Sequence, residues 1–349
     1  MSEPEQKPVT MQDIADAVSV SRMTVSRALR NDPRISQARR EEIHATAARL
    51  GYRANPLVSA LMAQLRGADP PEGSTLIAVV NGGGCRLADL SENHPEYLHT
   101  RHRYFLGAVE RCRQLGYRAE EFIIENPEQD ASLPRVLRAR GIRSILFLPF
   151  PGRVNLSGWA LDSFAMAVVG YSIEEPDLHM ALSDQFHNAE NAMGMLRVRG
   201  FRRIGLVLDR TPNLRISDQW RGAYAVQQDR LPAAERVPLL VLSADAPAGK
   251  VQQLKQWLRD QRPDTVMHIS EHLPSILRKC GSDAPPAFTL DRAKQNTSIP
   301  GIDQRQEQVA ANAVDLIIGQ LHRNEYGPPA VSKTMLTAGN WCEPASAAE

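Results

Sequence analysis

The 349-residue sequence has few cysteines, few aromatic residues, no long apolar run and no excess of charge of one sign. Cys85, Cys112, Cys280 and Cys342 are far apart and form no C-x-x-C pair, which is typical of neither a disulfide framework nor a zinc site. Apolar stretches such as Ile145–Phe150 are far shorter than the roughly 18 residues that span a bilayer. The first eight residues lack a signal-peptide pattern, so we expect a cytoplasmic protein that does not enter membranes.

The near-zero net charge hides a basic N-terminal segment. The whole chain has 41 Lys+Arg and 40 Asp+Glu, a net charge of +1. Residues 1–66 hold ten basic and seven acidic side chains, a net +3, whereas the remainder holds 31 and 33, a net −2. Eight arginines lie between Arg22 and Arg53. This asymmetry predicts a basic module attached to a near-neutral body, and the length is sufficient for two or three domains.

The first sixty residues predict three short helices. Thr10 and Asp13 have the spacing of a capping box at the start of the first helix. Ser21 can cap a second helix over Arg22–Arg30, and Ser36 can cap a third. Because the first two helices are separated by about three residues, the pattern describes a helix-turn-helix unit.

The second of these helices carries the candidate chemistry. Its outward face presents Arg22, Met23, Ser26 and Arg27. Arginine can bond bidentately to guanine, methionine can contact a thymine methyl group, and serine and threonine can reach phosphates. The same residues also fit the solvated face of an ordinary helix bundle, and this helix alone does not separate the two interpretations.

Three stretches of the N-terminal segment resemble the lactose-repressor (LacI/GalR) family of transcription regulators. They are Val9–Ala15, Val20–Leu29 and Leu50–Leu57, and together they extend over about fifty residues. One residue departs from the family pattern: Ser19 occupies a turn position where the family usually has glycine. A non-glycine residue at positive φ costs on the order of 1 kcal/mol. Ser19 therefore bears on the geometry of this turn and not on the presence of the helix-turn-helix unit.

The resemblance implies roles for individual residues of this segment. Major-groove base readers would be Arg22, Met23 and Arg27. Residues that contact phosphates or orient the helix would be Thr10, Ser21, Thr24, Ser26 and Arg30. A hinge helix over residues 55–66 would use Asn55 as its N-cap and Leu61 as a minor-groove wedge, with Met62 where relatives often carry a basic residue. The spacing of Leu57, Leu61 and Leu65 also fits a plain amphipathic helix.

From Thr75 onward, short apolar strands alternate with helices of ten or more residues, which predicts an α/β body of doubly wound parallel sheets. The body more loosely resembles the family's effector-binding core, which is similar to periplasmic binding proteins and has two lobes. The expected organisation is a flexible N-terminus at 1–8, a helix-turn-helix domain at 9–54, the hinge at 55–66, a linker at 67–74 and the core at 75–349. Within the core we expect lobe 1 at about 75–173 and 299–327, and lobe 2 at about 174–298 and 328–349.

A ligand cleft is expected at the carboxyl ends of the core strands. Candidate effector contacts are Asn81, Tyr104, Phe105, Tyr171, Arg215, Trp220 and Asp291. Asp291 aligns with an acidic residue that relatives use for an effector, whereas the aromatic residues could equally well be core. The glycines at 82–84 lack the spacing of a phosphate-binding loop, and His94, His99 and His102 lack a paired carboxylate or cysteine. We therefore expect no metal and no cofactor.

Together these features predict a non-enzymatic transcription regulator, in the form of a repressor. It would read a pseudo-palindromic operator in double-stranded DNA as a homodimer, under the control of a small-molecule effector such as a sugar or sugar derivative. Two other functions fit the body alone: a sugar-binding transport protein, and a cytosolic enzyme or small-molecule-binding protein that uses the same cleft. The basic N-terminal module favours the regulator.

Overall fold

The computed structural model describes residues 10–29, 34–50, 76–82, 84–90, 96–127, 131–209, 214–243, 246–270, 272–292 and 299–344. Its contacts divide the chain into two compact units. The head comprises the N-terminal residues to Asp69 with Leu321–Glu325, and the core comprises the remainder. The expected N-terminus at 1–8, hinge at 55–66 and linker at 67–74 lie outside the described residues. None of the described helices is long and apolar enough to cross a membrane.

The head contains the three expected helices, α1 (Met11–Ala17), α2 (Arg22–Ala28) and α3 (Gln37–Leu50). The predicted capping box is present, because Thr10 Oγ1 accepts from the amide of Asp13 at 3.4 Å and Asp13 Oδ2 accepts from the amide of Thr10 at 2.7 Å. Two amides that no helical carbonyl can reach are thereby satisfied. Ser21 caps α2 as expected, accepting from the amide of Thr24 at 3.1 Å.

A small apolar core fixes the three helices of the head. Its buried members come from the three helices and the end of α1, and are Ile14, Ala15, Val18, Val25, Ala28, Ile43 and Ala47. Two side chains of α3 also bond to backbone carbonyls: Arg39 donates to Val18 O at 2.9 Å, and the His44 ring lies 3.2 Å from Ala28 O. Burial on one side therefore sets the position of α2, while His44 contacts its C-terminal end and Arg39 contacts the end of α1.

Ser19 adopts the left-handed conformation that the turn requires, with φ of 52°. Its neighbour Val20 donates its amide to Ala15 O at 3.0 Å, which closes the turn between α1 and α2. Ser19 is exposed, and no β-carbon is needed there for packing. The glycine expected from the family pattern is thus replaced by a strained residue, while the turn geometry is kept.

We therefore expect Ser19→Gly to stabilise the head by about 0.5–1 kcal/mol, because relief of the left-handed strain exceeds the extra entropy of an unfolded glycine. The measurement is amide hydrogen exchange of α1 and α2 in the full chain. Ala17→Gly, at the exposed last residue of α1 two positions earlier, should instead speed exchange. Equal effects of the two substitutions would contradict the strain argument.

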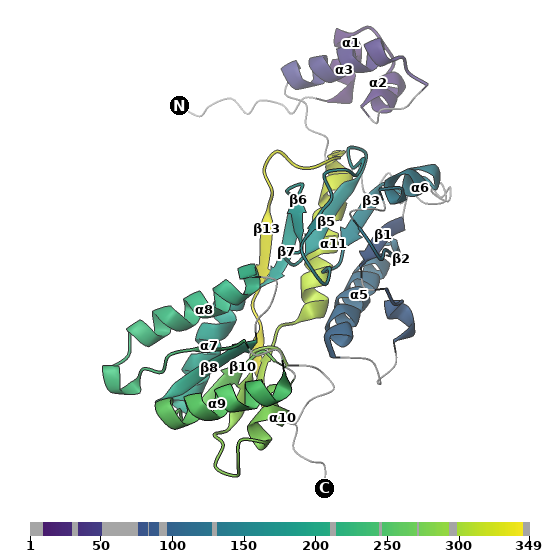
Figure 1. Cartoon of the computed structure of the whole chain (residues 1–349). Coiled ribbons are helices and arrows are strands. Elements are labelled where there is room, and N and C mark those ends of the chain that lie inside the picture. Colours follow the sequence, from purple (N-terminus) through teal and green to yellow (C-terminus); the bar gives the residue numbers. More distant parts are fainter. Residues whose placement is uncertain are drawn as a thin grey trace, which may run out of the picture. The chain divides into compact units, whose positions relative to one another are not determined.

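The core contains two six-stranded sheets, each the centre of one lobe (Figure 1). The first sheet is parallel and has the order β13 (Thr334–Thr337), β7 (His179–Ser183), β5 (Ala165–Val169), β3 (Ser144–Phe147), β1 (Leu76–Asn81) and β2 (Arg118–Ile123). The second has the order β14 (Asn340–Cys342), β12 (Gly301–Asp303), β11 (Ala287–Thr289), β10 (Thr265–His268), β8 (Ile204–Asp209) and β9 (Leu240–Leu242), with only the β12–β14 pair antiparallel. A two-stranded sheet of β4 (Val154–Asn155) and β6 (Ile173–Glu175) adjoins the first lobe. The predicted doubly wound α/β architecture is confirmed.

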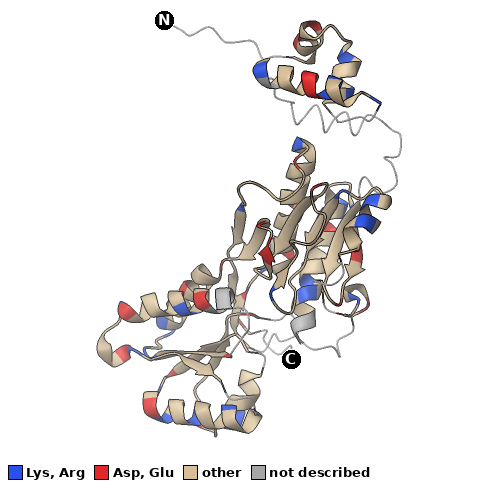
Figure 2. Cartoon of the chain, turned by 45° about the horizontal axis from the view of Figure 1, so that its top comes forward, with Lys and Arg blue, Asp and Glu red and all other residues tan. Residues whose placement is uncertain are grey.

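Helices flank both sheets. The first lobe carries α5 (Glu96–Gln114), α6 (Leu133–Ala139) and α11 (Gln306–Arg323). The second carries α7 (Gln185–Val198), α8 (Leu214–Asp229), α9 (Pro247–Gln261) and α10 (Leu273–Arg278), with short 3-10 turns at Leu87–Asp89 and Ala233–Glu235 elsewhere in the core. Figure 2 shows that charged residues lie mainly on helices and loops, whereas the strands are mostly uncharged. Strands buried on both faces are typical of such sheets.

The chain crosses between the lobes later than the sequence pattern predicted. The expected crossings were near 172–175, 291–299 and 327–330, but β7 and β13 pair within the first sheet, and β12 pairs within the second. The crossings therefore follow β7 at Asp184, β12 at Gln304 and β13 at Ala338. The expected lobe boundaries were displaced because the chain forms one more short strand before each crossing. These strands are β7 with five residues and β13 with four in the first lobe, and β12 with three in the second.

Candidate DNA-binding face and effector cavity

The outward face of α2 presents the predicted base readers. Met23 is 63% exposed, Arg22 is exposed and Arg27 is half-buried, while Val25 and Ala28 on the opposite face are in the core. Among residues 10–29 and 34–50, no ion pair or hydrogen bond engages either arginine. Two guanidinium groups and a methionine thus lie on one accessible helix surface, which is the arrangement that a major groove accepts.

Hydroxyl groups gather at the N-termini of the first two helices. Ser21 Oγ and Thr24 Oγ1 lie 2.9 Å apart at the start of α2, and Thr10 caps α1. Helix N-termini with small hydroxyl side chains favour anions such as phosphates. Ser26 is half-buried on α2. Arg30 and the hinge residues Asn55, Leu61 and Met62 lie outside the described residues.

A cavity of about 310 Å³ lies between the two lobes of the core. The first lobe lines it with residues from α5 and from the ends of β3, β5 and β7, which include Arg101, Tyr104, Phe150, Tyr171, Ser172 and Ser183. The second lobe contributes Gln185, Trp220, Ile269, Asp291 and Gln304. Most of these residues follow the carboxyl ends of parallel strands, where such folds bind ligands.

Four of the predicted effector contacts meet in this cavity, namely Tyr104, Tyr171, Trp220 and Asp291. Asn81 and Phe105 are buried nearby but do not line it, and Arg215 belongs to α8 with its side chain outside the described set. The pattern missed Arg101, Gln185 and Gln304. Arg101 had a detectable signal, because it continues the apolar stripe of Phe105, Ala108 and Cys112 along α5 at helical spacing.

The buried guanidinium of Arg101 is positioned by Asn81. The residue is 6% exposed, and its Nη2 donates to Asn81 Oδ1. The Asn81 amide nitrogen in turn donates to Glu121 Oε1 and to Cys85 O, both at 2.8 Å. The side chain of Asn81 thus acts behind the cavity, where it fixes the direction of a cation that lines it.

A chain of amides fixes the polar wall contributed by the second lobe. Gln304 Nε2 donates to Leu290 O at 2.9 Å, so Gln304 Oε1 must be the acceptor for Gln185 Nε2, which lies 2.9 Å away. Gln185 Oε1 is then left as an acceptor, and no described residue donates to it although Gln185 is only 8% exposed. A buried acceptor without a donor is costly, so this oxygen favours a ligand that can donate.

Burial alters the ionisation of two cavity residues. It raises the pKa of the Asp291 carboxyl to about 6, a shift opposed by the positive charge of Arg103 and by the hydrogen bond from Gln306 Nε2 at 2.8 Å. Burial also raises the pKa of the Tyr104 phenol, and the neighbouring Asp291 adds to the shift. The Tyr104 phenol is therefore neutral near pH 7, whereas the Asp291 carboxyl becomes ionised as the pH rises above about 6.

A buried ion-pair network joins the lobes beside the cavity. The side chain of Arg103 on α5 is 6% exposed; it donates to Asp303 Oδ1 at 2.8 Å and to Glu307 Oε2 at 2.7 Å. Asp303 ends β12 in the second lobe, whereas Glu307 begins α11 in the first. Between them Arg305 has φ of 54° and donates its amide to Asp303 Oδ1 at 2.9 Å.

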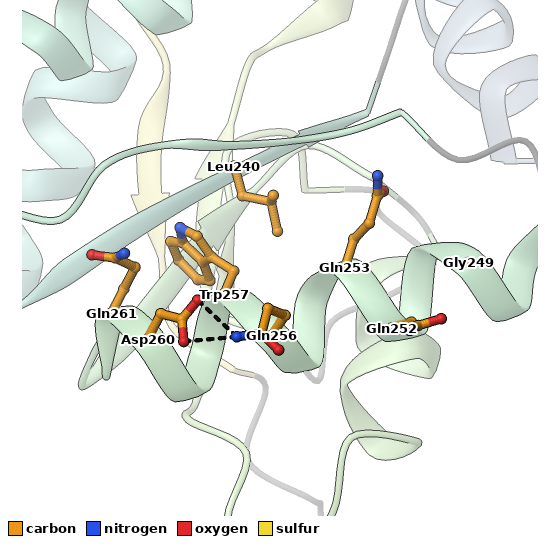
Figure 3. Close-up of a pocket in the computed structure, with 8 residues that line it drawn as sticks. All are labelled: Leu240, Gly249, Gln252, Gln253, Gln256, Trp257, Asp260 and Gln261. Carbon is orange, nitrogen blue, oxygen red and sulfur yellow. Dashed lines mark hydrogen bonds between the residues drawn. The ribbon is translucent and has the colours of Figure 1, made fainter.

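A second hollow, of about 600 Å³, follows α9 on the outer face of the second lobe (Figure 3). Its lining side chains include Gln252, Gln253, Gln256 and Asp260, and Gln256 Nε2 bonds to both carboxylate oxygens of Asp260. Such i,i+4 pairs are usual on a solvated helix face, and these groups do not converge on a common point. No metal-holding cluster of His, Cys, Asp and Glu occurs within the described ranges.

Comparison with known proteins assigns the head. Residues 10–55 match the family model described as "Bacterial regulatory proteins, lacI family". No curated protein matches the chain by sequence. A solved complex of the transcriptional regulator CelR with cellobiose is 15% identical, covers 95% of this chain and 98% of its own, and has a TM-score of 0.55.

Two further solved structures have the same fold. The lac repressor dimer bound to operator and the anti-inducer ONPF is 16% identical over 97% of this chain and 98% of its own, with a TM-score of 0.54. A LacI-family regulatory protein from Chloroflexus aggregans is 14% identical over 76% and 96%, with a TM-score of 0.58. At these identities the likeness is one of fold.

The head is a helix-turn-helix domain, and the two-lobed core has the fold of solved LacI-family regulators. The match to the family model assigns residues 10–55 as a domain of the lacI type.

Proposed function

We propose that the protein is a repressor that binds a pseudo-palindromic operator as a homodimer and is controlled by a small molecule in the cavity between its lobes. The observation that carries the proposal is the combination of an accessible Arg22–Met23–Arg27 face on α2 with a cavity lined by both lobes of the core. A two-fold dimer imposes its symmetry on the DNA, so two heads require two inverted half-sites.

Control by an effector follows from the position of the cavity. A ligand that contacts both lobes, through Tyr171 on one side and Asp291 on the other, binds best to one relative orientation of the lobes. It can shift the DNA-binding equilibrium only by the difference between its affinities for the two states. The hinge residues Asn55, Leu61 and Met62 would transmit the change to the minor groove, with Leu61 inserted between base pairs.

The direct test is selection of a duplex from a random library, followed by titration of the full chain against the selected site at several salt concentrations. Log K should fall linearly with log salt, because basic groups of the head would neutralise phosphates and release counterions. The hydroxyl groups of Thr10, Ser21, Thr24 and Ser26 would contact phosphates without adding to this dependence. Selection of inverted half-sites and a stoichiometry of two chains per duplex are expected. Binding that is insensitive to salt, or no selected sequence, would contradict a DNA-binding function.

Arg27→Ala should abolish discrimination at one symmetric base-pair position, with a loss of about 1–3 kcal/mol for the preferred sequence. The reason is loss of a bidentate contact to a base edge. The measurement is competition between the selected duplex and its single-base variants. Arg49→Ala, on the exposed surface of α3, is the matched control and should leave the preference unchanged. Uniform weakening on every duplex would make Arg27 a phosphate contact instead.

A further inference from the structure

We propose that the ligand of the cavity between the lobes is a polyhydroxylated anion of monosaccharide size, such as a uronate or an aldonate, with its anionic group at Arg101. The inference rests on the proposed function in that it names the effector of the same site. It excludes neutral sugars as the preferred ligands, and it assigns Arg101 as the residue that selects for charge.

The first support is the cation itself. Arg101 is 6% exposed, lines the cavity and is oriented through its bond to Asn81 Oδ1. The Asn81 amide that helps to orient it is held in turn by Glu121 Oε1 and Cys85 O. A guanidinium is the side chain best suited to bind a carboxylate or phosphate with two parallel hydrogen bonds.

The second support comes from the opposite wall. Gln185 Oε1 is buried and receives no hydrogen bond from any described residue, and the amide chain through Gln304 to Leu290 O fixes this atom as an acceptor. It requires a donor, which a ligand hydroxyl supplies and a carboxylate does not. Asp291, which lines the same cavity, adds a further acceptor when ionised. The anionic group is therefore assigned to the Arg101 wall, and the hydroxyl groups to the Gln185 wall.

The third support is the size and character of the space between these walls. About 310 Å³ is at the lower end of the volumes typical of ligand sites, which favours a single sugar unit over a larger ligand. Phe150, Tyr171 and Trp220 line the remaining surface and suit the apolar faces of a sugar ring. Gly82 allows Phe150 to take its place, because a β-carbon there would lie 2.0 Å from Phe150 Cδ1.

The test measures ligand binding to the full chain without DNA, by calorimetry and thermal shift. The probes are glucuronate and galacturonate with their uncharged amides, gluconate, glucose, and glucose 6-phosphate. We expect at least one uronate or gluconate to bind, with the uronate amide and glucose at least about tenfold weaker because they lack the charged hydrogen bonds. Strongest binding by glucose 6-phosphate would keep the anion assignment but identify a phosphate ester as the source of the charge.

Variants separate the role of Arg101 from its contribution to folding. Arg101→Gln should remove the preference for the acid over its amide, and Arg101→Lys should retain part of it because the charge remains. Arg111→Gln, on the same helix but paired with Asp315 away from the cavity, should keep the preference. If Arg101→Gln does not fold, the acid-to-amide ratio of the unmodified chain decides.

Three outcomes would overturn the proposal: equal binding of acid and amide, stronger binding of glucose than of any anion, and no binding by any anionic probe at millimolar concentration. These outcomes say nothing against DNA binding, which is measured separately on the selected duplex. Conversely, a chain that binds the uronate but no duplex would contradict the proposed function and leave the assignment of Arg101 standing.

Discussion

Gly107→Ala is expected to destabilise the core by about 3 kcal/mol, which is a large effect for the addition of one methyl group. Gly107 lies in α5 directly against the start of α11. A β-carbon at this position would lie 2.2 Å from Glu307 O and 2.5 Å from Glu307 Cα. These are backbone atoms, so no side-chain rotation can relieve the overlap, and the two helices must separate. Separation would also strain the bond from Arg103 to Glu307.

The measurement is urea unfolding of the full chain, followed by tryptophan fluorescence. Gly194→Ala is the matched control, because Gly194 is an exposed residue of α7 and a β-carbon there meets no atom within 4 Å. That change should stabilise α7 by about 0.5–1 kcal/mol through helix propensity alone. A Gly107→Ala protein as stable as the Gly194→Ala protein would mean that α5 and α11 are not in direct backbone contact.

Asp291→Asn is expected to remove a pH dependence of core stability that amounts to about 3 kcal/mol. The pKa of Asp291 is about 6 in the folded protein, against an ordinary value of 3.8, because burial disfavours the carboxylate. The native state therefore binds this proton more tightly than the unfolded chain does. The stabilising contribution is complete below pH about 4 and is lost as the pH rises to about 6.

Asparagine keeps the shape and the oxygen that accepts from Gln306, but it cannot ionise. The variant should therefore be more stable than the unmodified chain at pH 7, and the difference should vanish near pH 4. Urea unfolding at four pH values between 4 and 7 measures this difference. Asp229→Asn is the control. Because the side chain of Asp229 is 87% exposed, the change in the free energy of unfolding caused by this substitution should not vary with pH. A constant difference across this range would contradict a raised pKa for Asp291.

The head could be predicted from the sequence because its determinants are local. The capping box of Thr10 and Asp13, the cap at Ser21 and the turn at Ser19 each depend on residues within five positions of one another. Such short-range chemistry gives the same structure in most contexts. The same stretch also carries the family resemblance, so both lines of reasoning agreed.

The sequence pattern predicted the α/β class of the core, but it did not predict the positions at which the chain crosses between the lobes. The reason is physical. Strands β12 and β13 are short, and β13 has exposed residues at three of its four positions, so neither forms an apolar run. Their place is set by pairing with distant strands, for example Thr334–Thr337 with Met180–Ser183. Nothing in the local pattern encodes that pairing.

The cavity was predicted in part, for a similar reason. Tyr104, Tyr171, Trp220 and Asp291 were recognisable as large or acidic residues near strand ends. Gln185 and Gln304 were not, because their role depends on a hydrogen bond between residues 119 positions apart. In the sequence, Arg101 is a single cation in line with the apolar residues of α5. Its role as a lining residue follows only when the structure shows that this face of α5 borders a cavity.

The ion pairs of Arg103 hold the two lobes together at the crossing between β12 and α11. One guanidinium is bonded to a carboxylate on each side of the crossing between β12 and α11, four residues apart along the chain. A rotation of the second lobe moves Asp303 but not Glu307, so the lobes must pivot about this point or lose a largely desolvated bond. Rotation about the Arg103 junction would keep both ion pairs, whereas sliding of one lobe across the other would break the bond to Asp303.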